Sequence, residues 1–337
     1  MSGARDSTAA MNLLTVRLAR KRPEAADIMS FELVAVDGGA LPAFAAGAHI
    51  DVHLPAAAGA IVRPYSLCNS PLETHRYQLG VLREPASRGG SVAMHDALVE
   101  GQTLQISAPR NHFALAAAMP AATAPRSLLL AGGIGITPLL AMAEQLHADG
   151  AQFELHYAAR NAARAAFLPR LLAAPWLGQV RLHLDDGDAD QRLDLPALLA
   201  TPAAGAQLYV CGPAGFIDAV LAAARAAGWP EASLHSERFG AVLVQHDSDA
   251  AFEVQLGRDG RVVPVSPGQT VVQALALAGV VLPTSCEQGV CGTCLTRVLA
   301  GQPDHRDHYL TPEEQAAGDQ FLPCCSRSCS PRLVLDL

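Results

Sequence analysis

The spacing of four cysteines near the C-terminal end constrains this chain more than any other feature. Cys286, Cys291 and Cys294 form a C-x4-C-x2-C loop, and Cys324 follows after a long gap. This is the plant-type [2Fe–2S] spacing, in which one tight loop supplies three thiolates and a separate segment supplies the fourth. Small residues in the loop let backbone N–H groups approach the sulfurs. The sequence therefore predicts a binuclear iron–sulfur cluster.

A structural zinc site and unrelated free thiols are the alternatives. Zinc sites more often show two close C-x-x-C pairs, and this loop holds one. Cys325 and Cys329 lie close to Cys324 in the sequence, so spacing alone leaves the fourth ligand open. The segment 286–324 resembles plant-type ferredoxins, including its stretches 307–310 and 320–323. That resemblance implies Cys324 as the fourth ligand and a small α+β β-grasp fold from about residue 250 to residue 337.

The hydrophobic pattern changes twice along the 337 residues, a length that suits two or three domains. Short strands separated by Gly and Pro fill roughly the first hundred residues and predict an antiparallel barrel or sandwich. Strands then alternate with helices, which predicts a parallel sheet. We expect a multidomain protein with a β-barrel domain (1–118), an α/β parallel-sheet domain (119–238), a linker (239–250) and a ferredoxin domain (251–337).

A glycine-rich loop follows the first strand of the expected parallel sheet. Its residues Gly132, Gly133, Gly135, Thr137 and Pro138 open a helix, for which Thr137 is the expected cap and Pro138 suits the first turn. Glycines there let a pyrophosphate lie against backbone N–H groups at the helix N-terminus. The dinucleotide fingerprint is incomplete, because Pro138 replaces its third glycine and no acidic residue ends the next strand. A merely structural turn remains the alternative.

A second turn, Cys211-Gly212-Pro213, again ends a strand and starts a helix. Together the two turns resemble the pyridine-nucleotide domain of the ferredoxin–NADP reductase superfamily. The resemblance implies that Cys211 and the Gly212-Pro213 turn lie beside the nicotinamide. An inert thiol at the end of a strand is the alternative for Cys211.

The segment Arg63-Pro64-Tyr65-Ser66 matches the R-x-Y-S flavin signature of the same superfamily. Arg63 can pair with a phosphate through charge-assisted hydrogen bonds, and Tyr65 offers a flat face and a hydroxyl to a flavin ring. Ser66 can hydrogen-bond the isoalloxazine edge near its reactive nitrogen. Four residues alone can match by chance in a barrel strand, but here they occur in order with two further motifs.

Two further segments complete the predicted flavin site. Gly89, Gly90 and Ser91 precede a predicted helix at 92–98, whose N-terminus would suit a phosphate. In the superfamily an aromatic residue at the position of Phe239 lies near the flavin ring. Core packing is the alternative for Phe239.

The order of flavin, nucleotide and cluster motifs makes the chain from about residue 12 onward resemble the phthalate dioxygenase reductase family, and within it the vanillate O-demethylase reductase subunits. The resemblance implies FMN, NADH and a [2Fe–2S] cluster as cofactors, with Ser66 and Cys211 as catalytic residues. Electrons would pass from NADH through the flavin and the cluster to a Rieske-type non-haem iron oxygenase, active in aromatic O-demethylation or ring hydroxylation. NADH over NADPH rests on the resemblance, because Arg160 and Arg164 are either 2′-phosphate contacts or solvated cations.

Composition excludes several other classes. The net charge of −8 argues against a nucleic-acid binder, which would need basic patches. The longest apolar stretch, 128–143, is interrupted by three glycines and a proline, so no membrane span is expected. The N-terminal residues show no targeting signal, and we expect a cytoplasmic protein. A redox carrier, or a general flavin reductase with a fused ferredoxin serving another acceptor, is the rival function.

Overall fold

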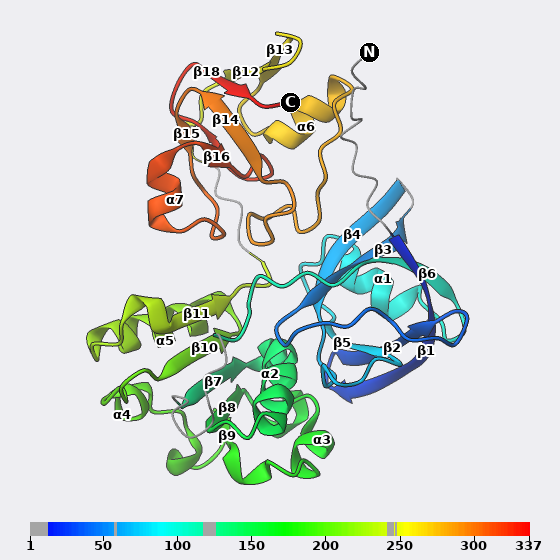
Figure 1. Ribbon diagram of the computed structural model, residues 1–337, viewed down its shortest axis with the longest axis vertical. Helices are drawn as coiled ribbons and strands as arrows, with labels where there is room; N and C mark the ends of the chain where they lie inside the picture. The colour runs from blue at the N-terminus through cyan, green and yellow to red at the C-terminus, as the bar shows by residue number, and fades with distance from the viewer. Residues whose placement is uncertain (1–12, 57–58, 117–125, 241–245, 247) are drawn as a thin grey trace. The chain divides into compact units, whose positions relative to one another are not determined.

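The computed structural model describes residues 13–56, 59–116, 126–240, 246 and 248–337. The chain divides into two compact units, Met1–Glu237 and Arg238–Leu337 (Figure 1). No helix in the described part combines the length and apolarity needed to cross a membrane. The finer division into three domains and a linker stays a prediction.

The first part of the first unit is the expected antiparallel barrel. Its sheet has the order β4-β3-β6-β1-β2-β5. The strands are β1 (Leu13–Ala25), β2 (Ile28–Ala35), β3 (His49–Ala56), β4 (Gly59–Ser66), β5 (Tyr77–Leu82) and β6 (Thr103–Ser107). An antiparallel bridge between Leu67 and Leu79 joins the two edges of the sheet. Strand alternation points Val16, Phe31 and Ile50 into a fully buried core.

The second part of the first unit is a parallel sheet with the order β11-β10-β7-β8-β9. Its strands are β7 (Ser127–Gly132), β8 (Phe153–Ala159), β9 (Val180–Leu184), β10 (Gln207–Cys211) and β11 (Leu234–Glu237). The helices are α2 (Ile136–Ala148), α3 (Leu168–Leu172), α4 (Leu195–Leu199) and α5 (Ala214–Ala226). Both faces are buried, because Leu129 belongs to one apolar cluster and Leu128 and Leu130 to another. Continuous apolar strands such as β7 are typical of such a sheet.

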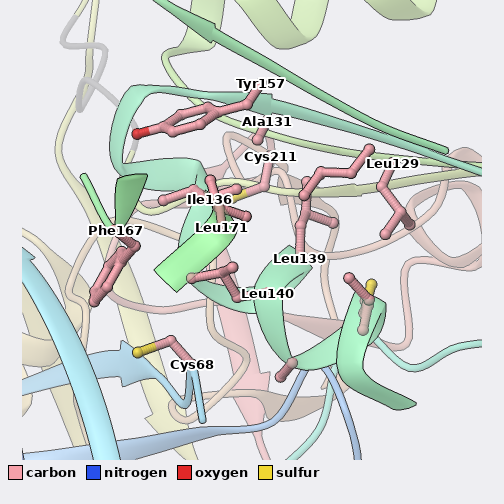
Figure 2. Close-up of a cluster of buried hydrophobic side chains, with 14 of the residues drawn as sticks. Cys68, Leu129, Ala131, Ile136, Leu139, Leu140, Tyr157, Phe167, Leu171 and Cys211 are labelled. Atoms are coloured by element: carbon pink, nitrogen blue, oxygen red, sulfur yellow. The ribbon is translucent and has the colours of Figure 1, made fainter. Parts of the chain in front are cut away.

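The barrel and the parallel sheet share one apolar cluster. Figure 2 shows this cluster, in which Cys68 from the barrel lies with Leu140 of α2 and Phe167. The absence of a side chain at Gly80 on β5 permits the contact, since a Cβ there would lie 2.7 Å from Cγ2 of Thr137. The Arg170 guanidinium also donates to the Cys68 carbonyl at 2.7 Å. These contacts hold the ends of the barrel strands against the nucleotide loop.

The second unit is an α+β fold around a mixed sheet with the order β13-β12-β18-β14-β16. Its strands are β12 (Phe252–Leu256), β13 (Val262–Val265), β14 (Thr296–Ala300), β16 (Gln320–Phe321) and β18 (Arg332–Leu335), beside a small ladder of β15 (Pro303–Asp304) and β17 (Arg327–Ser328). The helices are α6 (Val271–Leu277) and α7 (Pro312–Ala317). The turn at Asp259-Gly260 joins β12 to β13 as the sequence predicts, with Gly260 at a φ of 74°. A capping box at Thr270 and Gln273 starts α6.

An ion-pair network ties the end of the expected linker to the second unit. Asp249 accepts from Arg306 at 2.5 and 2.9 Å, and Arg306 also contacts Asp304 at 2.6 Å. Arg327 donates to the Ala250 carbonyl at 3.0 Å. The hydrogen bonds from Arg306 hold the pKa of Asp249 well below its usual range. Residues 249 and 250 are thus fixed to the body that follows them.

We expect Asp249→Asn to lower the free energy of unfolding at pH 7 by about 1.5–3 kcal/mol, the range for hydrogen bonds to charged groups. Because the pKa of Asp249 is depressed in the folded protein, its contribution is present above about pH 4 and is lost as the pH falls. Denaturant unfolding at pH 7 and pH 3 measures both effects. The control Asp259→Asn removes an exposed pair with Arg261 and should change stability by less than about 1 kcal/mol. Equal losses in the two variants would contradict the assignment.

Candidate functional site

The two predicted nucleotide turns meet at the carboxyl ends of β7 and β10. A Cβ on Gly135 would collide with the Cys211 carbonyl and would lie 2.5 Å from the Gly212 nitrogen. A Cβ on Gly212 would lie 3.0 Å from Cα of Gly132. Only glycine permits this approach, so the two motifs, about 75 residues apart in sequence, form one backbone surface.

This surface lies where the strand order of the sheet reverses. From β7 the chain proceeds through β8 to β9 on one side, and then returns to β10 and β11 on the other. Ligands of open α/β sheets bind outside the carboxyl ends of the strands at such a switch point. The predicted nucleotide residues therefore occupy the position that the topology favours for a ligand.

One local prediction in the loop is wrong. Helix α2 begins at Ile136 with Gly135 as its N-cap, so Thr137 lies inside the first turn. The Thr137 hydroxyl donates to the Ile134 carbonyl at 3.1 Å and its methyl group contacts the barrel. A short 3-10 turn at Gly133–Gly135 starts the helix early, which the sequence pattern did not indicate. Pro138 lies in the first turn as expected, and Gly133 has a φ of 53°.

The structure brings Arg63 and the Gly89-Gly90-Ser91 segment together. Arg63 lies on β4, and a Cβ on Gly90 would lie 2.6 Å from its Cγ. Helix α1 spans Gly90–Asp96 rather than the predicted 92–98, because Gly89 takes the N-cap in a left-handed conformation with a φ of 90°. The Ser91 hydroxyl contacts Ser87 at 2.9 Å and accepts from the Glu84 N–H at 3.1 Å. An arginine and a helix N-terminus thus lie side by side, as a phosphate site requires.

Pro64, Tyr65 and Ser66 complete β4, which pairs with β3. Tyr65 packs against the barrel core, and burial raises the pKa of its hydroxyl. Ser66, the last residue of the strand, is only 6% exposed, and its Oγ donates to Oε2 of Glu237 at 3.1 Å.

Glu237 is a candidate site residue that the motif analysis did not assign. It ends β11, paired with Cys211 at the end of β10, and so lies between Ser66 and Cys211. Burial raises the pKa of Glu237 from 4.5 to about 8, and burial together with the nearby Glu237 carboxylate raises the pKa of the Cys211 thiol. Figure 2 shows Cys211 among the apolar residues of α2 and β7. An acidic residue ending a short strand was the available signal, but sequence order does not show that β11 adjoins β10.

Phe239 lies in the second unit and is 39% exposed. It is therefore not among the buried core residues of the described chain. A contact of Phe239 with a flavin stays a prediction.

The four predicted cluster ligands converge in the second unit. Cys286, Cys291, Cys294 and Cys324 are buried, and among the described residues no cysteine forms a disulfide. The Cys286 thiol is within hydrogen-bonding reach of Cys291, and the Cys294 thiol is within reach of Cys324. The Cys286 thiol raises the pKa of Cys291, and the Cys324 thiol raises the pKa of Cys294, with burial adding to both, so thiolates at these positions would be stable only around bound cations.

The backbone of the loop suits this arrangement. Glu287, Gly289 and Gly292 have φ values of 55°, 70° and 69°. The Gln288 N–H donates to the Cys286 sulfur at 3.3 Å. A Cβ on Gly292 would lie 2.7 Å from the Tyr309 hydroxyl, and a Cβ on Gly289 would lie 2.5 Å from the Cys325 sulfur. The tight turns aim N–H groups at the sulfurs, as an iron–sulfur site requires.

The donor set fits a binuclear cluster better than a single metal ion. Across the described residues, no three His, Cys, Asp or Glu side chains gather tightly enough around one point to hold an ion. The Cys286 thiol is also within hydrogen-bonding reach of Cys324, so the four sulfurs form one connected group, as the four thiolate ligands of a binuclear cluster require. Cys325 is half-buried and Cys329 is exposed, and neither contacts this group through any hydrogen bond found in the structure.

Comparison with known proteins supports these features. The model of the 2Fe-2S iron-sulfur cluster binding domain matches residues 254–329, and that of the N-terminal domain of dimethylamine monooxygenase subunit DmmA-like proteins matches residues 115–234. The chain is 54% identical to a vanillate O-demethylase oxidoreductase of Pseudomonas putida, over 94% of this chain and 98% of the relative. It is 38% identical to the phthalate dioxygenase reductase of Burkholderia cepacia, over 96% of this chain and 97% of the relative.

A solved structure agrees with the fold. That structure, a phthalate dioxygenase reductase described as a modular structure for electron transfer from pyridine nucleotides to [2Fe-2S], matches with a TM-score of 0.73 at 38% identity. The match covers 97% of this chain and 98% of that one. The chain belongs to the phthalate dioxygenase reductase family of oxidoreductases.

We expect Cys324→Ser to lose the cluster, because one of its four thiolate ligands is then missing. Iron content should fall from two per chain to well below one, with loss of the visible absorption of the cluster. Cys325→Ser, the matched control one residue away, should retain both. Iron loss in Cys325→Ser but not in Cys324→Ser would exchange the two assignments.

We expect Glu237→Gln to change how stability depends on pH. In the wild type the folded state keeps a proton on Glu237 up to about pH 8, whereas the unfolded chain releases it near pH 4.5. Wild-type stability therefore falls as the pH rises between these values, at about 1.4 kcal/mol per unit. The free energy of unfolding of Glu237→Gln, relative to that of the wild type, should rise by on the order of 3 kcal/mol from pH 5 to pH 8. Above pH 8 the difference should stay constant. Denaturant titrations would refute this if the exposed control Glu84→Gln behaved in the same way.

Proposed function

We propose that this protein is the reductase component of an oxygenase system, carrying electrons from NADH through FMN to a [2Fe–2S] cluster and on to a Rieske-type non-haem iron oxygenase. The observation that carries the proposal is the convergence of Ser66, Cys211 and Glu237 at the strand ends beside the glycine turns, in a chain that also holds the four-cysteine loop. The bound groups supply hydride acceptance and single-electron transfer, and the protein sets their position and environment.

The nucleotide would bind at the surface formed by the two glycine turns. Gly132, Gly135 and Gly212 leave the backbone bare, and the start of α2 supplies N–H groups for a pyrophosphate. Gly133, Thr137 and Pro138 shape this turn, and Pro213 directs α5 away from it. Cys211 would present its neutral, buried side chain to the nicotinamide.

The surroundings of the two arginines that follow strand β8 favour NADH over NADPH. Arg164 lies 3.6 Å from Asp27, so its charge is already opposed by a carboxylate. Arg160 follows directly after β8 and is exposed. One exposed arginine is a weak site for a 2′-phosphate, which usually takes charge-assisted pairs from preorganised donors.

The flavin would bind along β4. Arg63 and the N-terminus of α1, with Gly89, Gly90 and Ser91, would hold the FMN phosphate, while Tyr65 would pack against the ring. Pro64 lacks an N–H and keeps the strand end rigid. Ser66 Oγ would face the ring edge, and the high pKa of Glu237 keeps the acid that it contacts neutral at pH 7. Phe239 is the proposed aromatic neighbour of the flavin, from the sequence resemblance.

The cluster would be held by Cys286, Cys291, Cys294 and Cys324. The domain organisation would follow the motifs, with an FMN domain (1–118), an NAD domain (119–238), a linker (239–250) and a ferredoxin domain (251–337). The vanillate O-demethylase oxidoreductase relatives favour aromatic O-demethylation as the process served, in the cytoplasm.

The absorption spectrum of the anaerobically purified protein, before and after NADH, tests the proposal. We expect a flavin band with an iron–sulfur shoulder, bleaching of both by NADH, and FMN on denaturation. Released FAD would refute the FMN assignment, and a colourless protein that binds zinc would refute the cluster and the electron path. NADPH at equal concentration is the matched nucleotide control and should bleach the protein at least tenfold more slowly.

A further inference from the structure

A cluster of polar side chains lies in the barrel next to Ser66, on strand β3 and in the loop after β6. His49 is 5% exposed and Asp51 is 1% exposed, and the two alternate on one face of β3. Arg110 forms an ion pair with Asp51, and the backbones of Arg110 and His49 exchange hydrogen bonds of 2.8 and 2.9 Å. The ring of exposed His112 lies 5.5 Å from the ring of His49. The group therefore runs from a buried histidine to the protein surface.

His49 is the direct cross-strand neighbour of Ser66. The Leu67 N–H donates to the Ala48 carbonyl at 2.9 Å, and the strand register pairs His49 with Ser66. Pairs alternate between hydrogen-bonded and non-bonded along an antiparallel ladder, so His49 and Ser66 form a non-bonded pair, with Cα atoms about 4.5 Å apart and side chains on the same face. Ser66 is thus flanked by His49 on one side and by Glu237 on the other.

Burial and the charges around His49 keep its imidazole ring neutral. Burial and the Arg110 cation lower its pKa from 6.5 to about 4, against the opposing effect of Asp51 and with a smaller contribution from His112. His53 lies further along the same face of β3, opposite Val62. The buried Nε2 of His49 has no hydrogen-bond partner among the described residues. A neutral imidazole can accept a proton at one nitrogen and release one from the other, without holding the charge.

The proposed function leaves a proton inside the protein. Oxidation of NADH to NAD⁺ yields two electrons and one proton, the electrons leave singly through the cluster, and the proton must reach solvent separately. Resting on that function, we propose that Ser66, His49 and His112 form the path by which this proton leaves, with the part-buried Glu237, hydrogen-bonded to Ser66, as its reservoir. The centroids of the two histidine rings lie 5.5 Å apart, so only some ring orientations allow direct contact. In the other orientations a water molecule can bridge the two rings.

The first test follows proton release in a single turnover of the holoprotein, with a pH indicator dye, NADH and ferricyanide. In His49→Gln we expect NADH oxidation in the first turnover to stay within about twofold of wild type, and proton release to slow by about tenfold or more, at the low end of general acid–base effects. Added imidazole should restore release in His49→Ala. The control His53→Gln removes a histidine from the same face of β3 and should release protons at the wild-type rate.

Equal release rates in His49→Gln and His53→Gln, without imidazole rescue, would overturn the proton path. If NADH failed to reduce wild-type holoprotein, the proposed function itself would fail, so the two outcomes are distinguishable.

A second measurement needs no histidine variant. In ¹⁵N-histidine-labelled holoprotein, the ring signals of His49 should shift with a midpoint near pH 8 as Glu237 ionises, and this shift should vanish in Glu237→Gln. The signals of His53 should not respond. A His49 ring insensitive to pH between 7 and 9 would show that it is not coupled to Ser66 and Glu237, and would refute the path.

Discussion

The close approach of two backbone turns, Gly135 against Cys211 and Gly212 against Gly132, is the constraint on which the site depends. Neither turn could bear a Cβ at these points without moving apart from the other. Because the turns end neighbouring parallel strands, their approach forms a backbone surface at the switch point of the sheet. The shape of this surface depends on the absence of side chains at its glycines.

The barrel reaches this crevice through apolar packing and one polar contact. Gly80 allows Thr137 to pack against β5, and Cys68 and Leu140 belong to one buried apolar cluster. The part-buried hydrogen bond from Ser66 to Glu237 joins the last residues of β4 and β11. Burial raises the pKa of Glu237 to about 8, so the contact places a neutral carboxylic acid, rather than a charge, beside Cys211 at neutral pH.

The second unit brings four thiols together, which as thiolates would repel one another unless cations were bound between them. Positive φ values at Glu287, Gly289 and Gly292 bend the loop, and Cys324 arrives from the segment after β16. Family membership and the match to the 2Fe-2S domain agree with this arrangement. The ion pairs of Asp249 with Arg306 hold residue 249 against the rest of this unit.

The sequence alone predicted the barrel, the parallel sheet and the α+β C-terminal unit, because strand alternation, βαβ spacing and cysteine spacing are local properties. It also identified both glycine turns, the β4 motif and the cysteine loop. It missed the true start of α2 and of α1, because Gly135 and Gly89 serve as N-caps through backbone conformation rather than through a side chain. Only the tertiary structure showed Glu237 and His49 on either side of Ser66, because strand order and register depend on contacts between residues up to 171 positions apart.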